Sequence, residues 1–264
     1  MLFRSYLTAM LGESMLDYDS MVGEMVHYGQ ALRAFVTDTS RELHEALVAG
    51  KKVLFEGAQG LMLDVDLGTY PYVTSSNTGA GSVTSGAGIA PSLIRTVVGI
   101  SKAYTTRVGS GPFPTELTDS LGDHLRSEGG EYGATTGRPR RCGWFDAVIV
   151  RKGVRTSGVN ALTLTKLDVL TGIDPIRVCT GYELDGKRID DVPASAAALA
   201  RCKPVYEQVE GWREPLTGID SIVRLPTAAR RYVERLETLV GVPVDILSVG
   251  PGREQTIVLS PPFR

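Results

Sequence analysis

The chain has 264 residues, of which 42% are hydrophobic and 22% charged, and its net charge at pH 7 is −2. This is the composition of a globular protein with a sizeable core, and the absence of a sustained basic run makes non-specific nucleic-acid binding unexpected. No stretch reaches the roughly 20 apolar residues that a membrane-spanning helix requires, so we expect no membrane partner.

The first 50 residues are predicted to form a helical layer. Apolar side chains recur there at spacings near 3.6, and Gly50 provides a stop before the first expected strand. The apolar positions are Leu32, Phe35, Val36, Leu43, Leu47 and Val48.

The stretch that follows, Lys52 to Tyr72, contains a glycine-flanked elbow between two apolar runs. Val53–Phe55 and Leu61–Leu63 resemble strands, and Gln59 stands between them with a glycine on either side of the elbow. Glycines let the backbone turn sharply, and a carboxamide at a strand end suits the edge of a base. A plain turn is the alternative interpretation.

A run rich in hydroxyls and glycines extends from Tyr72 to Ser82. It is either a surface loop or a cradle for a phosphate or hydroxyl group, because free N–H groups and short hydroxyls in a turn bind anions. A helix is then predicted from Pro91 to Val97 and a strand from Gly99 to Val108. The segment 109–114 is too rich in glycine and proline for regular structure.

Residues 120–133 are polar, and they lead into the loop 134–144, which has three arginines within four positions. The structural alternative is a solvated basic loop. We favour an anion clamp, because guanidinium forks bind carboxylate or phosphate bidentately and Pro139 stiffens the loop.

A strand and a short motif follow this loop. Asp146 is expected to cap a helix reaching Arg155, and residues 160–164 are expected to form a buried strand. The strand runs into Thr165-Lys166-Leu167-Asp168, which is similar to the guanine-recognition motif of GTP-binding proteins. A carboxylate at a strand end can accept both the ring N–H and the exocyclic amine of guanine.

The rest of the chain offers one more candidate contact. We predict a hairpin around Asp185-Gly186, irregular structure over 191–225, a helix over 227–240, and strands over 244–247 and 254–259. The turn 248–253 is either a plain turn or a second nucleotide contact. The three cysteines and three histidines lack metal-ligand spacing, and the odd cysteine count favours a reduced cytoplasmic compartment.

Together these stretches resemble the adenylosuccinate synthetase family. The matching runs are VLFEGAQG, LDVDLGTYPYVTSSNT, KAYTTRVGSGPFPTEL, ATTGRPRR-GW and TKLD, with weaker agreement at SVGPGRE. The resemblance implies an α/β fold related to the P-loop NTPases, with a mixed, mainly parallel central sheet flanked by helices and small β-hairpin and helical subregions. It also implies GTP-dependent, Mg²⁺-dependent ligation of IMP and L-aspartate to adenylosuccinate in purine biosynthesis, by a cytoplasmic homodimer.

The resemblance assigns roles to residues already noted. The IMP-binding positions are Gln59, Thr74, Val108 and Arg138. The aspartate-binding positions are Ala134, Thr135, Thr136, Gly137, Arg138, Pro139 and Arg140. The GTP-binding positions are Arg140, Lys166, Leu167, Asp168, Ser248, Val249 and Gly250.

One departure from the family pattern is large. The family begins with a strand and a phosphate loop, Gly-Asp-Glu-Gly-Lys-Gly-Lys, which supplies the catalytic base; the acid and the magnesium contacts lie in the same region. None of these appears here, so we expect the 264 residues to match the C-terminal three-fifths of one family domain. No catalytic or metal-binding residue is assigned in this chain, and the alternative function is a non-catalytic remnant that binds guanine and IMP.

Overall fold

The structure is a computed structural model, and it describes residues 9, 10, 12, 17–133 and 137–261. Two compact units are distinguished, Met1–Lys51 and Lys52–Arg264, and each is described by itself. The assignment of both parts to one family domain stays a prediction.

The first unit is helical where it is described, as the apolar spacing predicts. Helix α2 spans Tyr18–Leu32, a short 3-10 helix η1 spans Arg33–Phe35, and α3 spans Thr39–Val48. Asp17 and Asp38 cap the two α-helices by accepting backbone N–H groups of their first turns. Gly50, with φ +73°, ends α3. No residue of α2 or α3 is buried.

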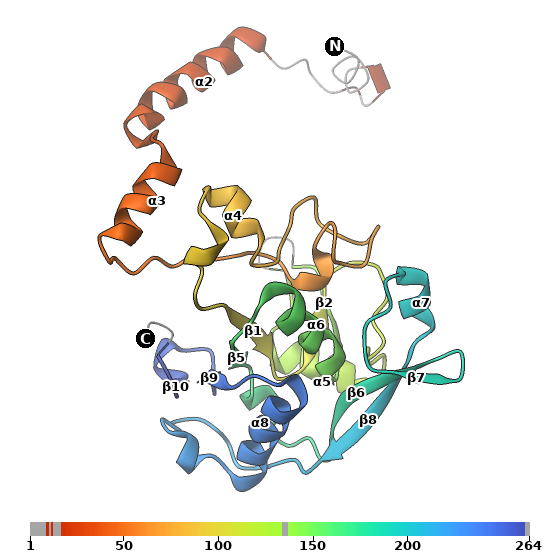
Figure 1. The fold of residues 1–264 in the computed structure, drawn as a ribbon. Coiled ribbons are helices and arrows are strands. Elements are labelled where there is room, and N and C mark those ends of the chain that lie inside the picture. The colour runs from red at the N-terminus through yellow and green to blue at the C-terminus, as the bar shows by residue number, and fades with distance from the viewer. Residues whose placement is uncertain (1–8, 11, 13–16, 134–136, 262–264) are drawn as a thin grey trace. The chain divides into compact units, whose positions relative to one another are not determined.

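A four-stranded sheet forms the centre of the second unit (Figure 1). Its strands are β1 (Val98–Lys102), β5 (Ala161–Thr165), β9 (Val244–Ser248) and β10 (Thr256–Val258), in that order. The first three run parallel and β10 is antiparallel to β9. The predicted mixed, mainly parallel sheet is therefore confirmed.

Two amphipathic helices contribute to the core around this sheet. Helix α6 spans Ala147–Ser157 and is capped by Asp146, as predicted. Helix α8 spans Thr227–Val240, and Gly241 ends it in the left-handed conformation at φ +81°, so both predicted boundaries are confirmed. Tyr232 of α8 is fully buried, and its hydroxyl donates to the carbonyl of Ala103, just beyond β1, at 2.6 Å.

A second sheet carries the predicted hairpin. Strands β6 (Ile176–Leu184) and β7 (Lys187–Ile189) are joined by Asp185-Gly186, both at positive φ; β4 (Phe145–Asp146) pairs with β6 in parallel. On the other side of β6 lies β8 (Lys203–Val209), preceded by α7 (Ala196–Arg201). The prediction of irregular structure over 191–225 is wrong here, because β8 is stabilised by pairing with a distant strand rather than by local pattern.

Two more predictions are corrected around the first sheet. The expected strand Gly99–Val108 is interrupted at two buried residues, Ala103 and Tyr104, and resumes as β2 (Thr105–Arg107), which pairs with β3 (Arg141–Gly143). The polar stretch 120–133 contains a helix that was not predicted, α5 (Ser120–Glu128). Only Gly122 and Leu125 of α5 are buried, so its apolar stripe is too narrow to detect in sequence.

The first part of the second unit, from Lys52 to the start of β1, departs most from expectation. Val53–Phe55 forms no strand, because no described segment pairs with it, and Leu61–Leu63 is a 3-10 helix, η2. The predicted helix from Pro91 to Val97 is only the short turn η3 (Pro91–Leu93). An unpredicted α4 (Ser82–Ala87) lies at the end of the glycine-rich run. Further 3-10 turns are η4 (Asp168–Leu170), η5 (Ile222–Arg224) and η6 (Arg253–Gln255).

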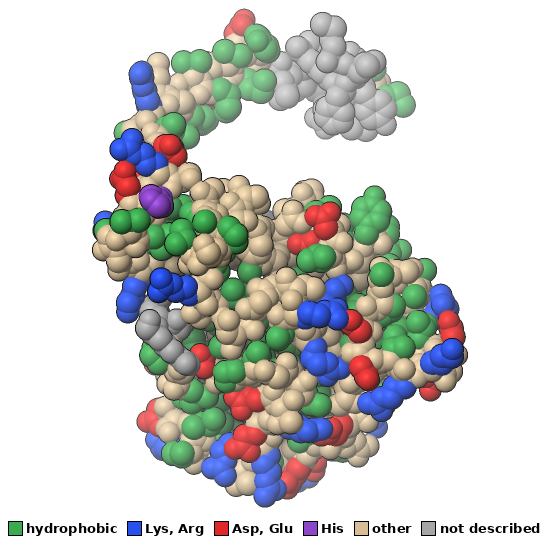
Figure 2. Space-filling view, in the orientation of Figure 1, with side chains coloured by type: hydrophobic (Ala, Val, Ile, Leu, Met, Phe, Trp, Pro, Cys, Tyr) green, Lys and Arg blue, Asp and Glu red, His purple; other side chains and the backbone are tan. Residues whose placement is uncertain are grey.

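Basic and acidic side chains are interspersed over the face of the second unit seen in Figure 2. Among the helices that the structure describes, none is long and apolar enough to span a bilayer.

Candidate functional site

The predicted guanine-binding residues lie together at one edge of the central sheet. Strands β1, β5 and β9 are adjacent and parallel, so the residues that follow them share the carboxyl edge, where open α/β sheets bind ligands. The N–H of Leu167, after β5, points to the carbonyl of Ser248, at the end of β9, with a separation of 3.4 Å. Val249 and Gly250 follow directly, and both are buried.

Lys166 and Asp168 have backbones and environments that suit a ligand site. Lys166 has φ +60°, a left-handed conformation that is uncommon for residues other than glycine and that tends to occur where function requires it. Asp168 is half-buried, and burial raises the pKa of its carboxyl group while backbone N–H groups and the Lys166 charge oppose the rise.

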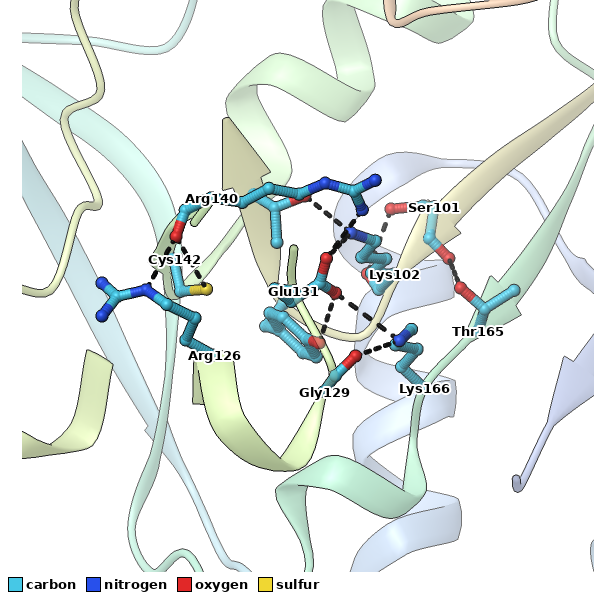
Figure 3. Close-up of polar contacts among 11 residues, drawn as sticks. Ser101, Lys102, Arg126, Gly129, Glu131, Arg140, Cys142, Thr165 and Lys166 are labelled. Carbon is cyan, nitrogen blue, oxygen red and sulfur yellow. Dashed lines mark hydrogen bonds and ion pairs between the residues drawn. The ribbon is translucent and has the colours of Figure 1, made fainter. Parts of the chain in front are cut away.

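A buried carboxylate, Glu131, joins this edge to the arginine-rich loop (Figure 3). Glu131 is fully buried. Its oxygens lie 2.7 Å from Lys102 Nζ, 2.6 Å from the Tyr104 hydroxyl, 2.9 Å from Arg140 Nη1 and 3.8 Å from Lys166 Nζ. Burial raises the pKa of Glu131, but these donors outweigh it, so the pKa is lowered and the group stays ionised.

The arginine-rich loop is held at its base by backbone pairing. Tyr132 and Pro139 form an isolated bridge, and the N–H of Arg140 donates to the carbonyl of Glu131 at 2.9 Å. Gly137 has φ +64°, and Arg138 and Pro139 are exposed. The predicted aspartate-binding residues Ala134, Thr135 and Thr136 lie outside the described residues.

Two of the predicted IMP-binding residues are close in sequence to a buried cation, Arg107, or to its contacts. Its Nη2 donates to Thr69 Oγ1 at 2.9 Å and to the carbonyl of Tyr72 at 3.2 Å. Val108 is the next residue and is exposed. Thr74, two residues beyond Tyr72, is half-buried. Arg107 therefore ties the hydroxyl-rich segment to the end of β2.

The same hydroxyl-rich segment is organised by Asp64. This carboxylate is 1% exposed and accepts hydrogen bonds from the backbone N–H groups of Asp66, Leu67, Thr78 and Gly79, at 2.6 to 3.3 Å. Burial raises the pKa of Asp64, but the four donors together lower it to about 2. The carboxylate thus closes residues 64–79 into one compact turn.

Gln59 lies at the elbow as predicted, but not at a strand end. Its φ is +61°, again left-handed, and its side chain is exposed. The elbow is tied to the hydroxyl-rich segment where Thr78 Oγ1 donates to the carbonyl of Gly60 at 3.0 Å. The contacts seen here connect the arginine loop with the lysine-aspartate motif, and the elbow with the hydroxyl-rich segment.

Four residues at the site carry no role in the sequence-based assignment: Lys102, Glu131, Arg107 and Asp64. Of these, only Asp64 has a local signal, because an aspartate side chain can accept hydrogen bonds from backbone N–H groups two and three residues further on. Across the described ranges, no group of three or more histidine, cysteine or acidic side chains could hold a metal ion.

Comparisons with known proteins agree on one family. A family model for adenylosuccinate synthetase matches residues 3–257. The adenylosuccinate synthetase of Pelobacter propionicus is 56% identical over 257 residues, which make up 97% of this chain and 60% of that protein.

Solved structures give the same result. The chain is similar to the fully ligated adenylosuccinate synthetase of Plasmodium falciparum, with a TM-score of 0.90, 37% identity and coverage of 97% of this chain and 62% of that one. The succinoaminodeoxyadenylate synthetase of cyanophage S-2L, bound to dGMP and dATP, shares the fold alone, at a TM-score of 0.51, 19% identity and coverage of 83% and 50%. This chain thus spans about three-fifths of the length of its two nearer relatives. By sequence and by structure, the chain belongs to the adenylosuccinate synthetase family.

Proposed function

We propose that this chain supplies the guanine-, IMP- and aspartate-binding part of a GTP-dependent ligase of purine biosynthesis. The reaction joins IMP and L-aspartate into adenylosuccinate and releases GDP and phosphate. The observation that supports it best is the Glu131 network, in which Arg140 and Lys166, predicted to bind aspartate and guanine, contact the same carboxylate. Family membership supports it independently.

The proposed chemistry has two steps. The γ-phosphoryl group of GTP moves to the 6-oxygen of IMP and turns a poor leaving group into phosphate, and the aspartate amine then displaces it. The first step requires a base for the ring proton and charge neutralisation at the phosphates. No residue of this chain is assigned to either task, and Mg²⁺, which the family resemblance implies, would supply charge neutralisation from outside these residues.

The residues of this chain would bind and orient the substrates. Asp168 would accept the ring N–H and exocyclic amine of guanine, and the apolar stem of Lys166 would lie over the base. Leu167, Ser248, Val249 and Gly250 would complete this site.

The other two substrates would use the loops. Arg138 and Arg140 would bind the aspartate carboxylates through guanidinium forks, together with the rest of the loop 134–140. Gln59 would contact the hypoxanthine edge, Thr74 the phosphate, and Val108 the ring through its backbone.

Turnover is the direct test. We expect the 264-residue chain alone to bind substrates weakly and to show no GTP hydrolysis that depends on both IMP and aspartate, measured by coupled phosphate release. Adding, as a separate polypeptide, the part of the Pelobacter propionicus relative that this chain does not cover should restore turnover. With the same added polypeptide, chains carrying Lys166→Ala or Arg140→Ala should show no restored turnover. IMP- and aspartate-dependent turnover by the chain alone would refute the dependence on a second part.

A second candidate function is a non-catalytic module that binds guanine and IMP, which the predicted guanine site at the carboxyl edge of β5 and β9 would serve equally well. In that case the added polypeptide would restore no turnover, while GDP and IMP would still bind to the chain in calorimetry.

The homodimer that the resemblance implies is tested by sedimentation of the chain with and without the added part.

A further inference from the structure

One carboxylate is contacted by four donor groups from three separate segments of the second unit. Glu131 is contacted by Lys102 at the end of β1, Tyr104 just beyond it, Arg140 at the end of the arginine-rich loop, and Lys166 beyond β5. Figure 3 shows Lys102, Arg140 and Lys166 directed at Glu131 from different parts of the chain. This carboxylate carries no role in the family resemblance.

The burial of Glu131 makes these contacts energetically important. A carboxylate removed from water costs several kcal/mol unless cations and hydrogen bonds compensate it. Here two cations and a hydroxyl lie within 2.9 Å and a third cation at 3.8 Å. Three positive charges facing one negative charge leave an excess of two, and an anionic ligand would balance that excess.

The contact with Glu131 uses one side of the Arg140 guanidinium group. Glu131 binds Nη1, which leaves the edge formed by Nε and Nη2. Elsewhere in the chain this same edge holds a carboxylate: Arg235 Nε and Nη2 each lie 2.6 Å from Glu207. Arg140 Nε is buried and has no hydrogen-bond partner in the part of the chain that the structure describes. With Nη1 bound to Glu131, Arg140 keeps a two-donor fork, Nε and Nη2, whose natural complement is a carboxylate or phosphate.

The contact with Lys166 is supported by the local backbone. The Lys166 ammonium group donates to the carbonyl of Gly129 while it approaches Glu131. A side chain at Gly129 would place its Cβ 2.1 Å from the Tyr104 hydroxyl, so this position must stay small for the tyrosine to reach Glu131. Lys166 therefore combines a left-handed backbone with a side chain that Gly129 and Glu131 hold in place.

We propose that Glu131 is a positioning residue that orients the Arg140 fork and the Lys166 side chain together, so that one carboxylate sets both the amino-acid and the guanine sites. The assignment of those two sites rests on the proposed function, whereas the orientation of the two side chains does not. Loss of the Glu131 charge should therefore disturb Arg140 and Lys166 at once, and should weaken aspartate and GDP binding by similar factors.

The test compares the intact wild-type chain with Glu131→Gln, Glu131→Asp and the control Glu116→Gln. Glu116 forms a bidentate pair with Arg141 on the neighbouring strand, so its removal breaks a comparable contact outside the cluster. The first readout needs no ligand. Hydrogen exchange of the arginine Nε–H groups is followed by NMR, with Arg140→Lys used to assign the Arg140 signal.

We expect the Arg140 Nε–H to exchange slowly in wild type and in Glu116→Gln, and about tenfold or more faster in Glu131→Gln. Glu131→Asp, which keeps the charge but shortens its reach, should give an intermediate rate. Circular dichroism checks that each variant is folded. If Glu131→Gln does not fold, Glu131→Asp is compared with wild type instead. An Arg140 Nε–H exchange rate equal to that of wild type in either folded variant overturns the proposal.

The second readout uses GDP and L-aspartate as separate probes at millimolar concentration. Glu131→Gln should raise both dissociation constants about tenfold, and Glu116→Gln should raise neither. A loss of only one affinity in Glu131→Gln overturns the shared positioning role. A wild-type chain that binds neither probe counts against the proposed function alone, because the exchange measurement still decides the orientation of Arg140.

Discussion

Two residues at the site other than glycine adopt left-handed backbones, and both are assigned to ligands. Gln59 and Lys166 have φ near +60°, a conformation that costs an L-residue roughly 1–2 kcal/mol. The third such residue, Asp185, belongs to a hairpin turn, where this conformation is ordinary. Because glycine would adopt this turn conformation with less strain, the presence of glutamine at position 59 indicates that its amide has a function.

Gln59 can be tested with two substitutions that remove the same amide. Gln59→Gly relieves the left-handed backbone, whereas Gln59→Ala keeps a Cβ there, so the glycine variant should be more stable by about 1 kcal/mol in urea denaturation. With the added part of the Pelobacter propionicus relative present, both variants should lose IMP affinity equally. Equal stabilities would mean that the backbone at position 59 is not strained, and an undiminished affinity would remove the amide from the IMP site.

Asp64 predicts a pH dependence of stability with a definite sign. Its pKa is about 2 in the folded chain against 3.8 ordinarily, so the folded state binds the proton more weakly than the unfolded state. The carboxylate therefore stabilises the fold above pH 3.8, by on the order of 2 kcal/mol, and this contribution is lost as the pH falls from 3.8 towards 2. Urea unfolding between pH 2 and 6 measures it.

The variant Asp64→Asn should lower stability at pH 6 by about 2 kcal/mol and flatten the dependence below pH 4. Asp66→Asn is the control, because Asp66 lies in the same turn but is exposed. An unchanged pH dependence in Asp64→Asn would show that the acid sensitivity comes from other groups.

At the scale of elements, local signals succeed where the chain alone sets the conformation. Helix α8 begins after Pro226 and ends at Gly241, and the hairpin turn lies at Asp185-Gly186, all as predicted. Elements that depend on a distant partner were missed or misplaced. Strand β8 exists because it pairs with β6, and Val53–Phe55 has strand-like residues but no partner among the described residues.

The glycine that ends α8 provides an element-scale prediction. Gly241 has φ +81° with open space around its Cβ position, so Gly241→Ala should cost about 1 kcal/mol through backbone strain alone. The same type of substitution inside α6, Gly153→Ala, should raise the free energy of unfolding by roughly 0.5 kcal/mol, because helix interiors favour alanine. Thermal or urea unfolding of the two variants should move in opposite directions; a shift of the same sign would contradict the helix-end argument.

At the scale of the whole molecule, burial differs sharply between the two units. The buried members of the two hydrophobic clusters in the second unit lie between Ala103 and Ile257, whereas α2 and α3 contain no buried residue. With 15 and 10 residues, these helices are near or below the length at which isolated helices are marginal in water. Their stability therefore depends on what covers their apolar side chains.

Native-state hydrogen exchange of the intact chain should reflect this difference. Amides of β5, β9 and α8 should exchange only through global unfolding, while amides of α2 and α3 should exchange at least about a hundredfold faster. Protection in α2 equal to that in β5 would contradict the expectation. If α2 were protected in this way, repeating the exchange at lower protein concentrations would show whether a second copy of the chain covers it.

The amino-acid sequence was enough to identify the family and the mixed, mainly parallel α/β class, and it predicts the binding segments. Each of these depends on short runs such as TKLD, or on local periodicity, turn and capping rules. Only the tertiary structure decided that Glu131, Lys102 and Arg107 belong with those segments, and that Arg140 and Lys166 share one carboxylate. Glu131 stands nine residues from Arg140 and 35 from Lys166, and no local rule specifies a contact that depends on strands β1 and β5 lying side by side.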